Sequence, residues 1–393
     1  MELSHRPAHP LTQGPNAHWF GYYDKCPCDA TGRYLVAMEA AFEGTRSPQP
    51  HDAVTIGLID TQDHNTWSPL TTTRAWCWQQ GTMLHWLPTA PDRQIIHNAL
   101  AESGDHFVAI IRDIHTGHTH TLPRPIYALH PQGTHALSIN FARTGRLRPG
   151  YGYVSAPDPT LGRMHPDDDG IWLMHLDTGD HQLILSLEAA VALRPDDRMH
   201  GAEHWFNHLQ FNTDGTRFLT LHRWKRPDEA HHRHTRLLTA APDGSDVRIV
   251  ADDDMTSHFD WRDPTHILAW ARQHDRGDHY YLFTDTEGGA PIETIAPDQL
   301  TVDGHCTYAP DRRWFLTDTY PDPNRLRHLL LYRPHDHRLV EIGAFHEPPE
   351  FHGEWRCDLH GRWNRDGTQV CFDSAQTGRR QLYTIDVADL VAP

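Results

Sequence analysis

The stretch DGHCTYAPDRRWFLTD, residues 303–318, contains the unit that decides the fold. A histidine precedes a short run that ends in an aromatic residue, a Pro-Asp turn follows, and a second apolar run begins after the turn. The same pattern recurs in NHLQFNTDGTRFLTL, SHFDWRDPTHILAW and LHGRWNRDGTQVCF. Two short apolar runs joined by such a turn indicate a β-hairpin, and the recurrence of the unit indicates a repeat protein.

Seven turns of this kind follow one another along the chain: CDATG, APDR, HPQG, NTDG, RDPT, APDR and NRDG. Six of these units end in an Asp/Gly hairpin and an outer strand, and YTIDVADL is expected to complete the seventh. Only LILSLEAAVAL is expected to form one or two helical turns. The pattern predicts an all-β fold, a seven-bladed β-propeller of four-stranded blades that spans residues 1–393 as a single domain. Two β-sandwiches would not repeat one unit seven times.

The longest interruption of the repeat is FARTGRLRPGYGYVSAPDPTLGRMHPDDDG, residues 141–170, called the insert below. We expect it to form a loop over the central funnel, because long loops on a rigid scaffold often carry function. Its arginines and tyrosines suit an anionic, ring-shaped ligand, although an ordinary solvated loop has the same composition. The predicted substrate contacts are Arg148, Tyr151 and Tyr153, with His204 and Arg223 from the next repeat.

The chain is acidic, with a net charge of −17 when histidine is neutral, which argues against a nucleic-acid or membrane partner. No signal peptide is visible, so we expect a cytoplasmic protein; a chain that had lost a leader would be periplasmic or secreted. Cys26 and Cys28 form a CPC motif that could hold a metal, but a structural role is favoured.

The histidine that opens the unit occupies the same column in four successive repeats, at His208, His258, His305 and His360. In a propeller this column lies where the innermost strand approaches the central channel. Converging imidazoles suit a divalent metal or acid–base chemistry near neutral pH. The alternative is that each histidine bonds the neighbouring blade and has only a structural role.

Several blocks resemble a bacterial group of seven-bladed, TolB-like propellers related to oligogalacturonate lyases and to a family of ulvan lyases. The specific blocks are HWFGYYDK, WQQG and RPGYGY, and the resemblance runs along nearly the whole chain. It implies a lyase that cleaves uronate-containing oligo- or polysaccharides by β-elimination and leaves an unsaturated uronic acid. With no signal peptide visible, imported oligosaccharides are the expected substrate.

The resemblance to the ulvan lyases implies a catalytic tyrosine followed 16 positions later by a carboxylate-binding arginine, and Tyr127 and Arg143 have this separation. It also implies that His208 or His258 acts as the base or neutralises the carboxylate. We expect Tyr127 and Arg143 to share a pocket with at least one of these histidines. His85 and His97 are further candidates.

The oligogalacturonate-lyase branch implies a metal bound by three histidines and a glutamine, which would make His258, His305 and His360 ligands of manganese or zinc. The chain departs from that pattern, because RCDLHGRW supplies only His360 where the branch has a close pair of histidines. No organic cofactor is expected. Two other functions stay open: a non-catalytic TolB-like propeller that binds a glycan or protein, and a metal-dependent hydrolase on the same scaffold.

Overall fold

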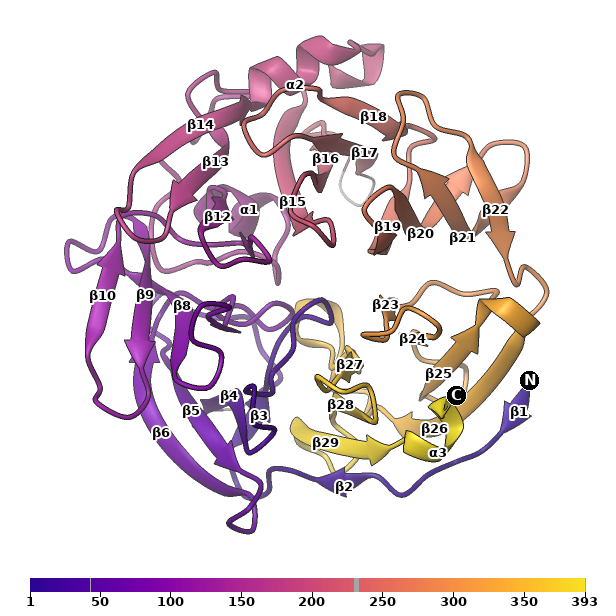
Figure 1. Cartoon of the computed structure of the whole chain (residues 1–393). Helices are drawn as coiled ribbons and strands as arrows, with labels where there is room; N and C mark the ends of the chain where they lie inside the picture. The colour runs from indigo at the N-terminus through magenta and orange to yellow at the C-terminus, as the bar shows by residue number, and fades with distance from the viewer. Residues whose placement is uncertain (43, 230–232, 393) are drawn as a thin grey trace.

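The computed structural model describes residues 1–42, 44–229 and 233–392. Seven β-sheets stand in a ring around one axis, and the strand that leads into each predicted turn lies at the inner edge of its sheet (Figure 1). The predicted seven-bladed β-propeller is therefore confirmed. Each blade contains four strands paired antiparallel, and blade six carries one strand more.

The strands of the first four blades follow chain order. Blade one contains β3 (Ala17–Trp19), β4 (Tyr34–Ala40), β5 (Val54–Asp60) and β6 (Thr66–Thr73). Blade two contains β7 (His85–Trp86), β8 (Gln94–Leu100), β9 (Phe107–Asp113) and β10 (Thr119–Leu122). Blade three contains β11 (Ala128–Leu129), β12 (His135–Ser138), β13 (Gly170–His175) and β14 (His181–Ser186). Blade four contains β15 (Glu203–Phe211), β16 (Phe218–Lys225), β17 (His234–Ala240) and β18 (Arg248–Ala251).

The last three blades continue the order. Blade five contains β19 (Thr256–Asp263), β20 (His266–Gln273), β21 (Gly277–Thr284) and β22 (Pro291–Ile295). Blade six contains β23 (Thr307–Tyr308), β24 (Phe315–Asp318), β25 (Leu326–Arg333) and β26 (Arg338–His346). Blade seven contains β27 (Arg362–Trp363), β28 (Gln369–Ser374) and β29 (Gln381–Asp386).

The predicted turns join the first and second strands of every blade. In the Asp-Gly-Thr turns, the Asp214 and Asp366 carboxylates accept the backbone N–H groups of Thr216 and Thr368, both at 3.0 Å. The glycine between them takes a left-handed conformation, as at Gly215 with φ of +78°. This local chemistry reverses the chain without help from distant residues, which is why the turns are readable in the sequence.

The two ends of the chain meet in blades six and seven. β2 (His9–Pro10) pairs with β29 and supplies the outermost strand of blade seven, while β1 (Glu2–Leu3) adds a parallel strand to β26. The prediction that YTIDVADL completes the seventh blade was wrong, because β29 runs instead into the short helix α3 (Ala388–Val391). Pairing an N-terminal strand with the last blade closes the ring (Figure 1).

The insert folds back on itself beside blades three and four. It begins with α1 (Phe141–Leu147), and the returning chain donates the Tyr153 N–H to the Phe141 carbonyl at 3.0 Å. A Cβ at Gly152 would lie 2.1 Å from the Gly145 nitrogen, so this crossing requires glycine.

The other helices are short: α2 (Leu187–Leu193), within the expected LILSLEAAVAL, and the 3₁₀ turns η1 (Asp197–Met199), η2 (Pro334–Asp336) and η3 (Gly353–Trp355). Across the described residues, no helix has the length and apolar character needed to cross a membrane.

Candidate functional site

The four predicted histidines come together at the axis, and we call His208, His258, His305 and His360 the axial histidines. Ring centroids are 4.0 Å apart for His258 and His305, 4.3 Å for His305 and His360, and 6.3 Å for His208 and His258. His208 and His360 have φ of +56° and +44°, and the ladders of β15 and β19 are irregular where they carry His208 and His258. Such bulges turn a side chain away from the regular face of its strand.

Carboxylates fix the orientation of two of these rings. His258 Nδ1 lies 2.9 Å from Asp303 Oδ1, and His305 Nδ1 lies 2.8 Å from Asp318 Oδ1. An Nδ1–H held by a carboxylate leaves Nε2 as the free acceptor for a proton or a metal. Burial lowers the pKa of His258, although Asp303 opposes this, so the ring is neutral near pH 7.

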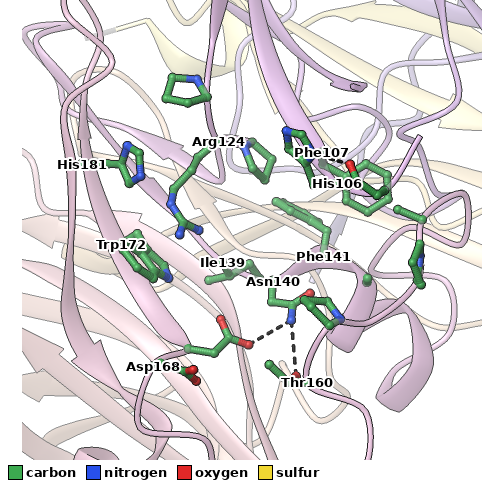
Figure 2. A pocket seen from close by; sticks show the side chains of 18 of the residues that line it. His106, Phe107, Arg124, Ile139, Asn140, Phe141, Thr160, Asp168, Trp172 and His181 are labelled. Atoms are coloured by element: carbon green, nitrogen blue, oxygen red, sulfur yellow. Dashed lines mark hydrogen bonds and ion pairs between the residues drawn. The ribbon is translucent and has the colours of Figure 1, made fainter. Parts of the chain in front are cut away.

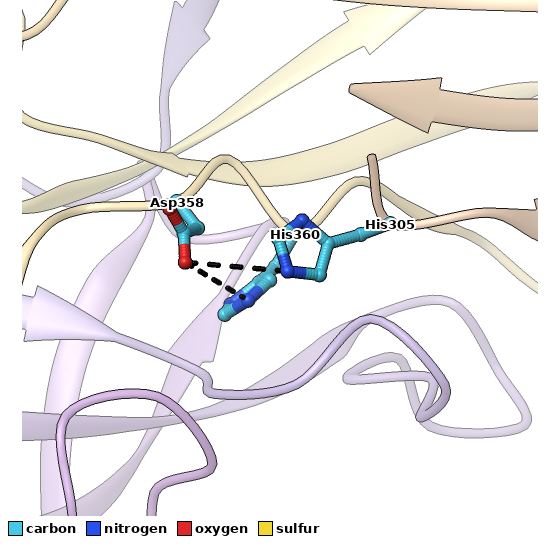
Figure 3. Close-up of side chains that lie close together, drawn as sticks. All are labelled: His305, Asp358 and His360. Atoms are coloured by element: carbon cyan, nitrogen blue, oxygen red, sulfur yellow. Dashed lines mark ion pairs between the residues drawn. The ribbon is translucent and has the colours of Figure 1, made fainter. Parts of the chain in front are cut away.

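His305, Asp358 and His360 form a group that suits a divalent cation (Figure 3). Asp358 Oδ2 lies 4.0 Å from His305 Nε2 and 3.8 Å from His360 Nε2. Both Nε2 atoms are buried, and neither has a hydrogen-bond partner among the residues that the structure describes. Bonds of about 2.0–2.3 Å to one ion require ligand atoms about 3–4 Å apart, which these spacings approach. The residues present therefore fit the metal implied by the resemblance.

Asp358 itself is held as an anion. Its carboxylate lies 2.8 Å from Arg327 Nη2 and 2.8 Å from Arg356 Nε. Burial alone would raise the pKa of Asp358, but these two guanidinium groups hold it well below its usual range. RCDLHGRW thus contributes an aspartate and a histidine to the group, whereas His258, predicted as the third ligand, lies outside it and is bonded to Asp303.

Three guanidinium groups gather near His208 without acidic partners. Within the described residues, Arg148, Arg223 and Arg233 form no ion pair, and only Arg223 has a side-chain hydrogen bond, from Nη2 to the Thr256 carbonyl at 3.2 Å. Burial and then the charges of Arg233 and Arg148 hold the pKa of Arg223 well below its usual range. Burial and Arg148 lower the pKa of Arg233 to about 10. Mutual repulsion of this kind is relieved by a bound anion.

Tyrosines fill the space between these groups. The Tyr22 ring stacks on His208 at 5.0 Å and its hydroxyl lies 3.4 Å from His208 Nε2. Tyr151 lies 5.4 Å from the His208 ring, accepts a hydrogen bond from Arg356 at 2.7 Å, and carries the Arg148 guanidinium 4.5 Å above its ring. Burial raises the pKa of Tyr22 well above 10, so this phenol is protonated at neutral pH.

Tyr127 adjoins the axial histidines and holds the backbone of one of them. Its hydroxyl accepts the His208 N–H at 2.8 Å and the Gln80 amide N–H at 2.7 Å. Burial, followed by the nearby Asp24 carboxylate, raises the pKa of Tyr127 well above its usual value. The structure therefore places Tyr127 beside His208 as a protonated phenol.

Arg143 does not lie in the same pocket as Tyr127 and His208. Its guanidinium is buried and donates five hydrogen bonds, to the carbonyls of His204, Thr160, Arg163 and Met164 and to the Thr160 hydroxyl. All of its donors are used inside the protein, so Arg143 ties the insert to β15 and cannot also clamp a carboxylate. The 16-residue spacing was matched, but the expected shared pocket with Tyr127 is not formed.

Two predicted substrate contacts also lie elsewhere. His204 Nδ1 bonds His222 Nε2 at 3.0 Å inside blade four. The Tyr153 hydroxyl bonds Asn98 Nδ2 at 2.9 Å, and its ring stacks on Phe141. Both side chains bond partners inside the blades, whereas Arg148, Tyr151 and Arg223 lie around His208.

Four further candidates stay outside the site. His85 lies on β7, and His97 lies on β8 with Nδ1 3.0 Å from the Asn98 carbonyl. Cys26 and Cys28 are free thiols, and the described residues offer no third metal ligand beside them.

Several members of the site were missed by the sequence analysis. Tyr22 stands in HWFGYYDK, a block that was recognised without assigning its tyrosines a role. Asp303 opens the stretch quoted first, yet only its neighbour His305 was considered. Asp358, Arg233 and Arg356 carried no repeat signal at all.

Comparison with known proteins finds two solved enzyme structures with a similar fold. No family model matches the sequence, and no curated protein matches it. An oligogalacturonate lyase from Vibrio parahaemolyticus is 13% identical over 97% of this chain and 94% of its own, with a TM-score of 0.64. An oligogalacturonate lyase in complex with manganese is 13% identical over 99% and 95%, with a TM-score of 0.65.

The propeller is also similar to other enzymes. A prolyl endopeptidase matches 95% of this chain but 47% of its own, at 10% identity and a TM-score of 0.54. At these identities the comparisons establish the shared propeller fold, and function must be argued from the residues.

Proposed function

We propose that this protein is a lyase that cleaves uronate-containing oligosaccharides by β-elimination. The observation that carries the proposal is the meeting, at one place on the axis, of neutral histidines, a protonated tyrosine and guanidinium groups without acidic partners. Elimination from a uronate has three chemical requirements. The charge of the carboxylate must be neutralised, the proton at C5 must be removed, and the oxygen that leaves C4 must be protonated.

Arg223, with Arg148 and Arg233, would bind the substrate carboxylate. Among the described residues Arg223 Nε and Nη1 have no hydrogen-bond partner although the side chain is almost wholly buried, so a carboxylate bound there would accept a charge-assisted hydrogen bond in a region shielded from water. The bound anion would also relieve the repulsion among the three cations. With Arg143 fully engaged elsewhere, these residues take over the role predicted for it.

His258 is the candidate base and Tyr22 the candidate acid. Asp303 keeps the proton of His258 on Nδ1, so Nε2 can take the C5 proton of the sugar. The electron pair of the broken C–H bond forms the C4–C5 double bond as the C4–O bond breaks. Tyr22 would give its proton to the departing oxygen, and His208, stacked on it, would orient the phenol. Tyr127 would position His208 through its backbone.

His305, Asp358 and His360 would hold a divalent metal. When bound, such an ion adds positive charge beside the carboxylate and so makes the C5 proton more acidic. A donor set of two imidazoles and one carboxylate accepts manganese or zinc. The manganese complex of a similarly folded lyase supports testing manganese first.

The test is a screen of uronate oligosaccharides, beginning with oligogalacturonate, with and without Mn²⁺. Each elimination creates a double bond conjugated to a carboxylate, which is read as new ultraviolet absorbance. We expect turnover on at least one substrate, and loss of most of it in Arg223→Gln. Arg33→Gln is the matched control, because Arg33 pairs with Asp60 in blade one, away from the axial histidines.

A folded protein that binds such oligosaccharides without forming the double bond would instead support a non-catalytic propeller.

A further inference from the structure

A cavity lies between blades two and three, where the insert covers their junction (Figure 2). Its volume is about 390 Å³, within the range of about 300–1,000 Å³ that is typical of small-molecule sites. Flat apolar side chains line much of it, among them Phe107, Pro125 and Phe141. None of the axial histidines or unpaired arginines of the proposed reaction site lines this cavity.

Arg124 stands in the middle of the lining with its donors unused. Its guanidinium carbon lies 3.4 Å from the centre of the Trp172 ring, and Figure 2 shows the two groups side by side. In the part of the chain that the structure describes, the Arg124 side chain has no hydrogen bond and no ion pair, and its Nε is buried. Among the described residues the Trp172 Nε1–H also has no acceptor, and it is sealed from solvent as Arg124 Nε is. The two Nη groups of Arg124 are the donors left for a ligand in the cavity, and an oxygen that bound them would gain charge-assisted hydrogen bonds.

The acidic residues of the lining are already engaged. Asp168 pairs with Arg163 at 2.7 Å, and Asp105 pairs with His106 at 2.6 Å. Asp169 accepts the Asn140 amide and the Gly170 N–H, both at 2.9 Å. Asp169 is the acidic side chain whose charge acts on Arg124, but the two groups form no ion pair within the described residues. Arg124 is therefore a guanidinium of the described lining whose donors stay open to an acceptor oxygen of a ligand.

We propose that this cavity binds a carboxylate carried on a six-membered ring. The carboxylate would accept hydrogen bonds from the Arg124 guanidinium, which Trp172 holds in place by stacking, and the ring would pack on Phe107 and Phe141. The cavity is too large and too apolar for a bare inorganic anion to fill. A uronic acid and an aromatic carboxylic acid share this chemistry.

The site is separate from the reaction centre but close to it. Phe141, which lines the cavity, stacks on Tyr127 with a centroid separation of 5.7 Å, and the Tyr127 hydroxyl bonds the His208 backbone. One aromatic ring pair therefore separates the two sites. The proposal does not depend on lyase activity.

The experiment measures binding of galacturonate, benzoate and galactose by calorimetry and ligand-observed NMR. Arg223→Gln serves as the background, so that binding at the axis does not obscure the second site. We expect at least one of the two carboxylates to bind and neutral galactose not to bind. Adding Arg124→Gln should weaken binding by about tenfold or more, and Trp172→Phe should weaken it several-fold.

Arg163→Gln is the matched control, because Arg163 lines the same cavity but is paired with Asp167 and Asp168. Binding of galacturonate alone would identify a sugar-acid site, and binding of benzoate alone an aromatic-acid site. Failure of both carboxylates to bind, or equal affinity in the Arg124→Gln variant with an unchanged melting temperature, would overturn the proposal. If the lyase screen yields no unsaturated product, the proposed function fails, but the binding proposal for this cavity still stands.

Discussion

Asp303 decides which nitrogen of His258 faces the axis, because its carboxylate holds the Nδ1 proton at 2.9 Å. In Asp303→Asn the amide no longer holds the proton on Nδ1 of His258. The tautomer with an unprotonated Nε2, which is the one that can accept a proton, is then no longer favoured. We expect kcat to fall by about 10–100-fold with little change in KM, the usual cost of removing such a partner. Asp298→Asn, at an exposed position, is the control. An unchanged kcat in Asp303→Asn would remove His258 from the role of base.

His360 should be needed for metal binding but not for folding. At a Mn²⁺ concentration of about 100 times Kd, a single site stabilises the native protein by about 2.7 kcal/mol, which raises the melting temperature measurably. His360→Ala should lose this rise, whereas His118→Ala, on the exposed end of blade two, should keep it. The same rise in His360→Ala as in the wild type would place the ion elsewhere.

The residues of the site were predictable only where the repeat exposed them. Four histidines occupy the same position in successive repeats. Because equivalent positions of the blades lie equally close to the propeller axis, these side chains meet there. Arg143 was chosen by spacing along the chain, which does not tell where a long guanidinium side chain will end. It reaches backbone carbonyls of the insert and β15. Asp358 was missed because it became a candidate ligand only when blades six and seven brought it beside His305.

At the scale of elements, the crossing of the insert is the most sensitive point. In Gly152→Ala the new methyl group would lie 2.1 Å from the Gly145 nitrogen and 2.4 Å from the Phe141 carbonyl oxygen. The backbone must shift, and we expect a loss of about 1–3 kcal/mol in the free energy of unfolding. Because Tyr151 precedes this glycine, KM for the substrate should rise as well.

The control for this crossing is Gly162→Ala, in the same insert, where a methyl group would meet no atom within 4 Å. Gly162 also has a positive φ of +84°, so a small loss of stability is expected there too. Denaturant melts of both variants would distinguish steric conflict from backbone strain. Equal stability of Gly152→Ala and the wild type would contradict the described path of the insert.

The elements themselves followed the sequence where their causes are local. The two Asp-Gly-Thr turns are closed by side chains two residues away, and the seven turns between first and second strands were all found from such local signals. The outer strand of blade seven was assigned wrongly because that strand is β2, which lies more than 370 residues from its partner β29 along the chain. Which strand closes the ring depends on the whole fold, so no local sequence pattern predicts it.

At the scale of the molecule, buried neutral histidines should make the protein sensitive to mild acid. Burial lowers the pKa of His97 to about 4 and that of His204 to about 3. The unfolded chain binds these protons near pH 6.5, and the native protein does so only at lower pH. Stability is therefore complete above about pH 6.5 and falls as the pH drops toward 4, by about 3 kcal/mol for His97 alone.

Melting temperatures measured between about pH 7.5 and about pH 4.5 should fall steadily. His97→Gln removes one of these groups, so unfolding takes up at most one proton fewer and the melting temperature should fall less steeply with pH. His118→Ala changes an exposed histidine and should follow the wild type. A melting temperature that stays level across this range would show that these imidazoles are not buried as neutral groups.

The central claim is that the axial site eliminates rather than hydrolyses, and the fate of water tests it most directly. Hydrolysis places one oxygen atom from water in the products, whereas elimination places none and leaves a C4–C5 double bond. We therefore propose digestion of oligogalacturonate, or whichever uronate oligosaccharide the screen identifies, in heavy-oxygen water, followed by mass spectrometry. For elimination we expect product masses that sum to the mass of the substrate, with no heavy oxygen incorporated. Products that gain one labelled water per cleavage would contradict it and identify a hydrolase.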